Sequence, residues 1–168
     1  MDKIIGIAGW KNAGKTTLTE SLVTELTSRG WTVSTVKHAH HDADVDAAGT
    51  DTHRHRTAGA SEVMLVTGRR WALMHELRDE EEPPLDQILA RLSPCDIVLV
   101  EGYKTGPHRK IEVRRTAAQN QAPLPETANV VAIASDSPVH MAPVPVFALD
   151  DVTAIADFVE VAVGLRNR

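Results

Sequence analysis

Phosphate-binding chemistry is indicated near the start of the chain, where an apolar run, IIGIA, leads into the string GWKNAGKT. This string matches the pattern G-x-x-x-x-G-K-[ST], whose backbone N–H groups surround the phosphates of a nucleotide. The match lies between a predicted strand and a predicted helix, which is the context that this chemistry requires. We therefore predict a phosphate-binding loop made of Gly9, Trp10, Lys11, Asn12, Ala13, Gly14, Lys15 and Thr16.

Four residues of this loop have roles that follow from their chemistry. Gly9 and Gly14 have no Cβ, so the backbone can turn sharply and approach the phosphates. We expect the Lys15 ammonium to reach the β- and γ-phosphates and the Thr16 hydroxyl to bind Mg²⁺. The expected ligand is therefore a nucleoside triphosphate with Mg²⁺.

A second position for the metal follows from the string DIVLVEG. A carboxylate at the end of a buried strand is the usual holder of Mg²⁺ or of its water shell in such sites. Glu101 comes directly after four apolar residues and before a glycine. An ordinary charged strand end would have the same pattern, but we assign Glu101 to the metal.

Histidines are concentrated between His38 and His55, a segment that holds five of the eight in the chain together with interleaved aspartates. Their spacing fits no closed zinc site, and no cysteine accompanies them. A loop that orders around the γ-phosphate and Mg²⁺ is the simpler interpretation, with Asp46 or Asp44 touching hydrated Mg²⁺. A protein-only metal site is the alternative.

The predicted elements alternate between strands and helices, which indicates an α/β fold: a mostly parallel P-loop sheet flanked by helices, with an inserted antiparallel β-hairpin. We expect one domain over residues 1–168, the hairpin at about 62–77, and a mobile loop at about 116–129. A second strand is expected from Trp31 to Val36. Two prolines are expected to open a helix that continues to Leu92.

Composition narrows the class of protein. The net charge of −5 argues against a general nucleic-acid or membrane-surface binder. The single cysteine excludes an internal disulfide, and no apolar stretch approaches the ~20 residues needed to span a bilayer. We expect a cytoplasmic protein that binds neither nucleic acid nor membrane.

Several strings together resemble one family. GWKNAGKTT, TVKHAHHDADVDAAGTDTHRHRTAGA, GRRWALMHEL, DIVLVEGYK and KIEV occur in this order and spacing. The chain is similar to the MobB family, molybdopterin-guanine dinucleotide biosynthesis protein B. The resemblance covers residues 3 to about 115 well and extends more loosely through VVAIASD.

The resemblance implies a homodimeric GTP-binding adapter with weak GTPase activity, which assists a molybdopterin guanylyltransferase and has molybdopterin as a further candidate ligand. It extends the phosphate loop to Thr17, places Glu101 at the metal and puts Asp46 in the switch-like segment. It also places Arg69, Arg70 and Trp71 on the hairpin, which in the family helps to build the dimer.

The residue that reads the base is not given by the usual signature, because the chain contains no N-K-x-D string. Asp136 follows an apolar run, and its carboxylate could accept both the ring N–H and the exocyclic amine of guanine. A simple turn residue is the alternative. Two further functions remain open: a metallochaperone-type GTPase with a histidine-rich metal-binding loop, and a small-metabolite P-loop kinase or ligase.

Overall fold

The computed structural model describes residues 3–39 and 44–165. The chain divides into two compact units, one formed by the residues up to His38 and from Leu89 onward, the other by Ala39–Ile88. The single-domain organisation of residues 1–168 stays a prediction.

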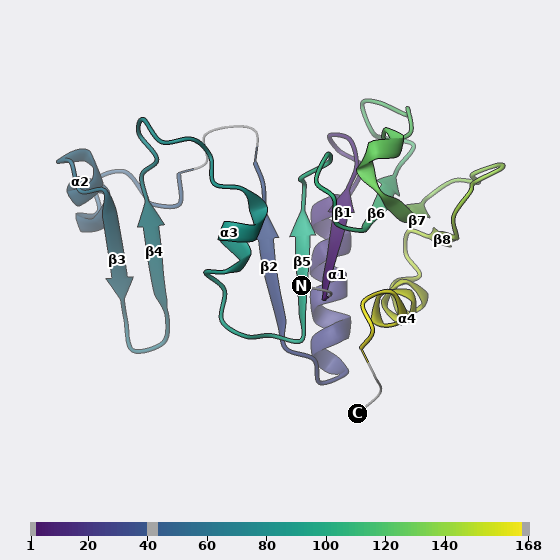
Figure 1. The fold of residues 1–168 in the computed structure, drawn as a ribbon, viewed down its shortest axis with the longest axis horizontal. Helices are drawn as coiled ribbons and strands as arrows, with labels where there is room; N and C mark the ends of the chain where they lie inside the picture. Colours follow the sequence, from purple (N-terminus) through teal and green to yellow (C-terminus); the bar gives the residue numbers. More distant parts are fainter. Residues whose placement is uncertain (1–2, 40–43, 166–168) are drawn as a thin grey trace. The chain divides into compact units, whose positions relative to one another are not determined.

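A six-stranded, all-parallel sheet forms the first unit, with the strand order β2-β5-β1-β6-β7-β8 (Figure 1). Because β1 lies between β5 and β6, the loop that leaves β1 is flanked by the ends of these two strands. The strands are β1 (Ile4–Ala8), β2 (Val33–Lys37), β5 (Ile97–Glu101), β6 (Lys110–Arg114), β7 (Val130–Ser135) and β8 (Val146–Ala148).

Two helices pack on the same face of this sheet, α1 (Lys15–Ser28) and α4 (Val152–Ala162). Leucines recur every four residues along α1, which places their side chains on one side of the helix. They share a buried cluster with alternate residues of the strands and with the apolar side of α4. The fully buried members include Leu22, Leu26, Ile5, Leu99 and Ile155. This core holds the start of α1 over the end of β1.

The opposite face of the sheet carries an unusual buried cation. Lys110 has no exposed surface, and its ammonium donates hydrogen bonds to the carbonyl oxygens of Gly106, His108 and Ala128. Burial lowers the pKa of Lys110 to about 8. Space for these side chains comes from Gly6, because a Cβ there would lie 2.6 Å from Lys110 Cγ and 2.7 Å from His108 Nε2.

The second unit contains α2 (Asp51–Thr57), most of α3 (Leu85–Leu89) and the antiparallel hairpin of β3 (Glu62–Val66) and β4 (Trp71–His75). Thr50 caps α2 by accepting a hydrogen bond from the His53 N–H. The hairpin confirms the expected inserted element.

Three segments differ from the sequence-based expectation: the end of α3, the start of β2 and the loop at 116–129. The helix α3 ends at Leu89, because the chain turns there and the Leu92 N–H donates to the Leu89 carbonyl. Trp31 precedes β2 and donates its indole N–H to Glu160. The expected loop at 116–129 contains a 3-10 helix, Glu126–Ala128, and a buried Leu124. Its mobility stays a prediction.

Within the described residues, no helix combines the length and the apolar character that crossing a membrane requires.

We predict that His108 makes the protein lose stability in mild acid. Burial, and next the charge of Lys110, lower the pKa of His108 to about 4, and neither ring nitrogen has a hydrogen-bond partner in the described structure. The unfolded chain takes up this proton near pH 6.5, whereas the folded chain does not. Stability is therefore lost as the pH falls from about 6.5 to 4, by roughly 1 kcal/mol after discounting for the partly exposed ring.

Urea unfolding at pH 7 and pH 4.5 tests this for the wild type and for His108→Gln. The variant should lose less stability between the two pH values. An equal loss in both proteins, or an NMR titration of the His108 ring near pH 6.5, would contradict the prediction.

Candidate functional site

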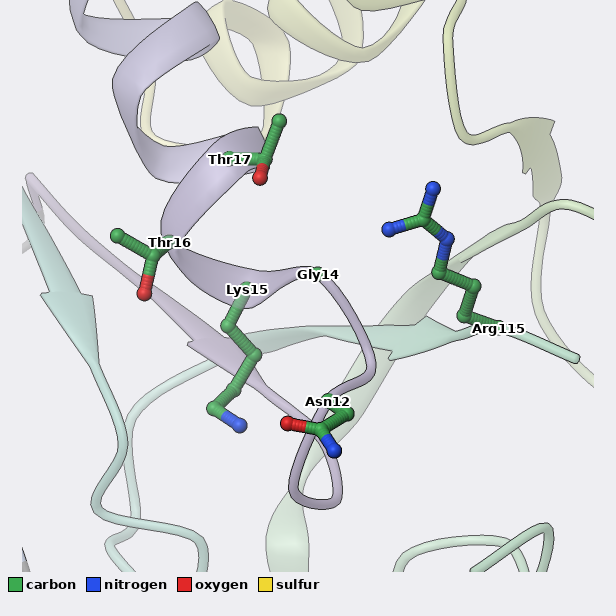
Figure 2. Close-up of a pocket in the computed structure, with 6 residues that line it drawn as sticks. All are labelled: Asn12, Gly14, Lys15, Thr16, Thr17 and Arg115. Atoms are coloured by element: carbon green, nitrogen blue, oxygen red, sulfur yellow. The ribbon is translucent and has the colours of Figure 1, made fainter. Parts of the chain in front are cut away.

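The loop between β1 and α1 has the shape of an anion cradle. Its backbone enters the left-handed region at Asn12, with φ 66°, and at Gly14, with φ 92°. Gly14 precedes α1 without any side-chain cap, so the first N–H groups of the helix remain available to a ligand. A cavity of about 340 Å³ opens here (Figure 2), and it is lined by Asn12, Gly14, Lys15, Thr16, Thr17 and Arg115.

Gly9 allows the loop to start against the neighbouring strand. A Cβ at this position would lie 2.5 Å from the backbone carbonyl oxygen of Val113 on β6. No side chain fits at that distance unless the backbone shifts. The first glycine of the motif is therefore required by the contact with β6 as well as by the turn.

Lys15 bends back over the loop, and its ammonium donates to the carbonyl oxygen of Trp10 at 2.9 Å. Partial burial is the main cause that lowers the pKa of Lys15, and the charges of Lys104 and Lys37 act in the same direction, whereas Glu101 opposes them. An anion in the cradle would stabilise the charged form. Lys15 is therefore placed to pair with phosphate oxygens.

Thr16 and Glu101 meet at the metal end of the site. The Thr16 hydroxyl donates to Glu101 Oε1 at 2.9 Å, although 85 positions separate the two residues in the chain. The Lys37 ammonium lies 3.6 Å from the same carboxylate oxygen, and the Glu101 side chain is only 10% exposed. A hydroxyl beside a carboxylate is the oxygen donor set that suits Mg²⁺ when phosphates supply further ligands.

Two kinds of contact fix the Trp10 side chain, one through its indole N–H and one through its ring. The indole N–H donates to the carbonyl oxygen of Ala122, and the Lys104 ammonium lies 4.2 Å from the ring centroid. The ring also packs against a small cluster that contains Ala8 and Leu124. These contacts stabilise one conformation of the loop.

Asp136 lies after β7, and its carboxylate is already hydrogen-bonded. It accepts the backbone N–H of Thr116 at 2.9 and 3.1 Å and the hydroxyl of Thr116 at 2.9 Å. The backbone hydrogen bond from Thr116 is the largest of the causes that lower the pKa of Asp136. The carboxylate stays charged and accessible, so its role in reading guanine remains a prediction.

Asp46 belongs to the second unit, where it accepts hydrogen bonds from Arg56 Nε at 3.2 Å and from the Thr52 hydroxyl at 3.1 Å. Its role at the metal stays a prediction. His40 and His41, on which the histidine-rich metal site partly depended, lie outside the described residues. Among residues 3–39 and 44–165, no group of three or more His, Cys, Asp or Glu side chains is arranged to hold a metal ion.

Two basic residues of the site were missed by sequence reasoning, Arg115 and Lys104. Arg115 directly follows the strand next to β1, and Lys104 follows Glu101 by three positions. Their positions after buried strands could have indicated them, because ligands of parallel sheets lie at the carboxyl ends of strands.

The all-parallel sheet and the loop after its central strand define a P-loop protein. The model of the MobB family, "Molybdopterin guanine dinucleotide synthesis protein B", matches residues 4–136. The chain belongs to this family, as its sequence motifs indicated.

Named relatives agree with the family. The chain is 39% identical over 162 residues to the "Molybdopterin-guanine dinucleotide biosynthesis adapter protein" of Escherichia coli (strain K12), with 95% of this chain and 92% of that protein covered. It is 38% identical over 160 residues to the protein of the same name from Haemophilus influenzae, with 94% and 87% covered.

Solved structures are similar as well. The crystal structure of a MobB homologue from Bacillus stearothermophilus has a TM-score of 0.68 at 27% identity and covers 99% of this chain and 100% of that one. The crystal structure of Bacillus subtilis MobB has a TM-score of 0.76, with 95% and 97% covered, and at 24% identity it supports the fold alone. The comparisons favour the adapter interpretation over the metallochaperone and the kinase.

We predict that Gly9→Ala weakens phosphate binding at the loop, because its Cβ would overlap the Val113 carbonyl and push the loop away from β6. We expect a loss of about 1–3 kcal/mol in stability and at least a tenfold loss in affinity for Mg²⁺-tripolyphosphate, measured by calorimetry.

Gly68→Ala is the matched control, since nothing lies within 4 Å of the added Cβ and the glycine has no positive φ. It should leave both quantities within error of the wild type. Unchanged tripolyphosphate binding in Gly9→Ala would contradict the assignment.

Proposed function

We propose that this protein is a GTP-binding adapter in the synthesis of molybdopterin guanine dinucleotide, where it assists a molybdopterin guanylyltransferase. The observation that carries the proposal is the phosphate cradle with the adjacent Thr16–Glu101 pair. The chain is 39% identical to a named adapter protein of molybdopterin-guanine dinucleotide biosynthesis, and this similarity supports the assignment to that pathway.

The loop would hold the phosphates through the backbone N–H groups of residues 9–17 and through the Lys15 ammonium. Thr16 and Glu101 would hold Mg²⁺, with Asp46 as a further candidate near its water shell. When bound, Mg²⁺ neutralises part of the phosphate charge and orients the terminal phosphates. Lys37 forms an ion pair with Glu101 at 3.6 Å and restricts the movement of this carboxylate.

Hydrolysis by this site is expected to be slow. Glu101, the carboxylate beside the loop, is engaged by Thr16 and Lys37 and is not positioned as a free general base. Positioning and electrostatic stabilisation then supply what catalysis there is. This supports an adapter or a GTP carrier with weak GTPase activity rather than an efficient hydrolase.

GTP is proposed over ATP because Asp136 lies at the ligand-facing end of the sheet with a charged carboxylate. Oδ1 already accepts from both the N–H and the hydroxyl of Thr116, whereas Oδ2 accepts only the longer bond from the N–H, at 3.1 Å, and can accept a further hydrogen bond. Guanine offers a ring N–H and an amine side by side, whereas adenine does not.

A homodimer is proposed through the hairpin. A two-stranded sheet is only marginally stable alone, and although α2 packs against β3, several large apolar side chains of the hairpin stay exposed among the described residues. Met64, Leu65, Val66 and Trp71 are 57%, 45%, 68% and 63% exposed. A second copy could bury these side chains, with the turn residues Arg69 and Arg70 at the rim. Molybdopterin remains a candidate ligand of the assembly, and the cytoplasm is the proposed location.

We predict that nucleotide loading controls the partnership. The guanylyltransferase should be retained by the wild type in the presence of GTP and Mg²⁺ more than in their absence, as measured by pull-down. Lys15→Ala should lose this difference and weaken GTP binding by tenfold to a hundredfold, roughly the effect of removing charge-assisted hydrogen bonds.

Lys3→Ala, an exposed lysine before β1, is the control and should behave as the wild type. Retention of the partner that is equal with and without GTP would contradict the proposed dependence. Absence of calorimetric heat with any nucleotide would remove the proposed function itself.

We predict that Asp136→Ala weakens GTP binding by about tenfold or more and weakens ATP binding by a smaller factor, because only GTP loses a contact to its base. Competition calorimetry with both nucleotides measures the ratio. Equal losses for GTP and ATP would contradict base selection by Asp136.

A further inference from the structure

Arg115 is a cationic side chain of the pocket that neither the motif nor the family resemblance assigned. It directly follows β6 (Lys110–Arg114), the strand beside β1 on the side away from β5. The loop after β1 is therefore flanked by Glu101, at the end of β5, and by Arg115, after β6. These two residues mark opposite sides of the cradle.

The position of Arg115 is close to the loop backbone. A Cβ built on Gly14 would lie 3.8 Å from both Cδ and Nη1 of Arg115. Figure 2 shows the guanidinium on the Gly14 and Thr17 side of the cavity, with Lys15 and Thr16 on the other side of the loop. The side chain is 49% exposed, so its donors are accessible to a ligand in the cavity.

Asp136 and the segment after β6 hold the backbone that carries Arg115. Thr116 is fixed by its hydrogen bonds to Asp136, and the Arg115 carbonyl accepts from the Gln121 amide and from the Ala118 N–H. The Asp136 carboxylate lies 3.9 Å from Arg115 Nε. At this distance the two side chains attract each other without a hydrogen bond, and Figure 2 shows the guanidinium beside the cavity.

The order of groups along the cradle gives the direction of a bound triphosphate. The pair of Thr16 and Glu101, which would hold Mg²⁺, lies on the β5 side, and a metal held there would neutralise the terminal phosphates. The nucleoside end of the ligand must then lie on the β6 side, next to Arg115. A guanidinium suits a phosphate there because its planar fork can donate two hydrogen bonds.

We propose that Arg115 binds the α-phosphate at the nucleoside end of the nucleotide, from a backbone segment that Asp136 holds through Thr116, so that it recognises nucleoside di- and triphosphates alike. This inference rests on the proposed nucleotide-binding function. An arginine that contacts the γ-phosphate would instead bind triphosphates more tightly than diphosphates.

Calorimetry of the full chain tests the proposal with three ligands in Mg²⁺: GTP, GDP and inorganic pyrophosphate, which can fill the β- and γ-positions and leave the α-position empty. Arg115→Ala should weaken GTP and GDP by the same factor, about tenfold or more. The affinity for pyrophosphate should change by less than about twofold, because both of its phosphates can bind over the loop and Lys15. Arg115→Lys should restore only part of the affinity, since an ammonium cannot donate in a planar fork.

Two controls accompany these variants. Arg91→Ala removes an exposed arginine outside the cavity and should leave all three affinities unchanged. Lys15→Ala should weaken all three. Thermal unfolding of each variant shows that it is folded, and Arg115→Gln replaces Arg115→Ala if the latter is not.

The outcomes separate the inference from the function on which it rests. A loss for GTP with GDP spared would place Arg115 at the γ-phosphate and overturn the proposal. An equal loss for all three ligands, or no loss, would also overturn it. Failure of the wild type to bind either nucleotide would instead remove the proposed function.

Discussion

The close contact between the Gly9 backbone and β6 is the constraint on which the site depends. The carbonyl oxygen of Val113 occupies the space that a Cβ would need at the start of the loop. The loop therefore lies directly beside β6, and its other flank faces the end of β5. This arrangement places Glu101 and Lys37 on one side of the loop and Arg115 on the other.

Local charge explains how an acidic chain can bind a polyanion. The chain carries a net charge of −5, yet Lys15, Lys37, Lys104 and Arg115 gather around the cradle. After burial, which is the main cause, the charges of Lys104 and Lys37 lower the pKa of Lys15, while Glu101 opposes them. Such clustering costs free energy in the absence of an anion, and a bound phosphate would relieve it. The cation cluster and the helix N-terminus thus favour the same ligand.

The hydrogen bonds of Asp136 give this residue a structural role beside the predicted contact to guanine. The sequence predicted only a carboxylate after a buried strand, with both oxygens available to a ligand. In the structure, it joins the end of β7 to the segment after β6 through Thr116, and it lies near Arg115. One residue is therefore placed to connect the proposed base contact and the proposed phosphate contact. Trp10 has a comparable structural role, because it ties the loop to Ala122.

Much of the fold and part of the site could be predicted from the sequence. The loop motif, the hairpin, the capped helix α2 and the acidic end of β5 depend on short segments, in which residue type and spacing decide backbone conformation. The early end of α3 at Leu89 was not predicted, because its apolar spacing continues to Leu92 while the chain turns.

By itself, the sequence determined that a phosphate loop joins a buried strand to a helix, that a carboxylate follows another buried strand, and that the chain resembles one family. Only the tertiary structure decided that β6 lies against the loop, that Thr16 bonds to Glu101, and that Arg115 and Lys104 join the site. The physical reason is that the order of strands in a parallel sheet depends on packing between distant segments. Local periodicity reports which residues are buried, but it does not report which strand will be the neighbour.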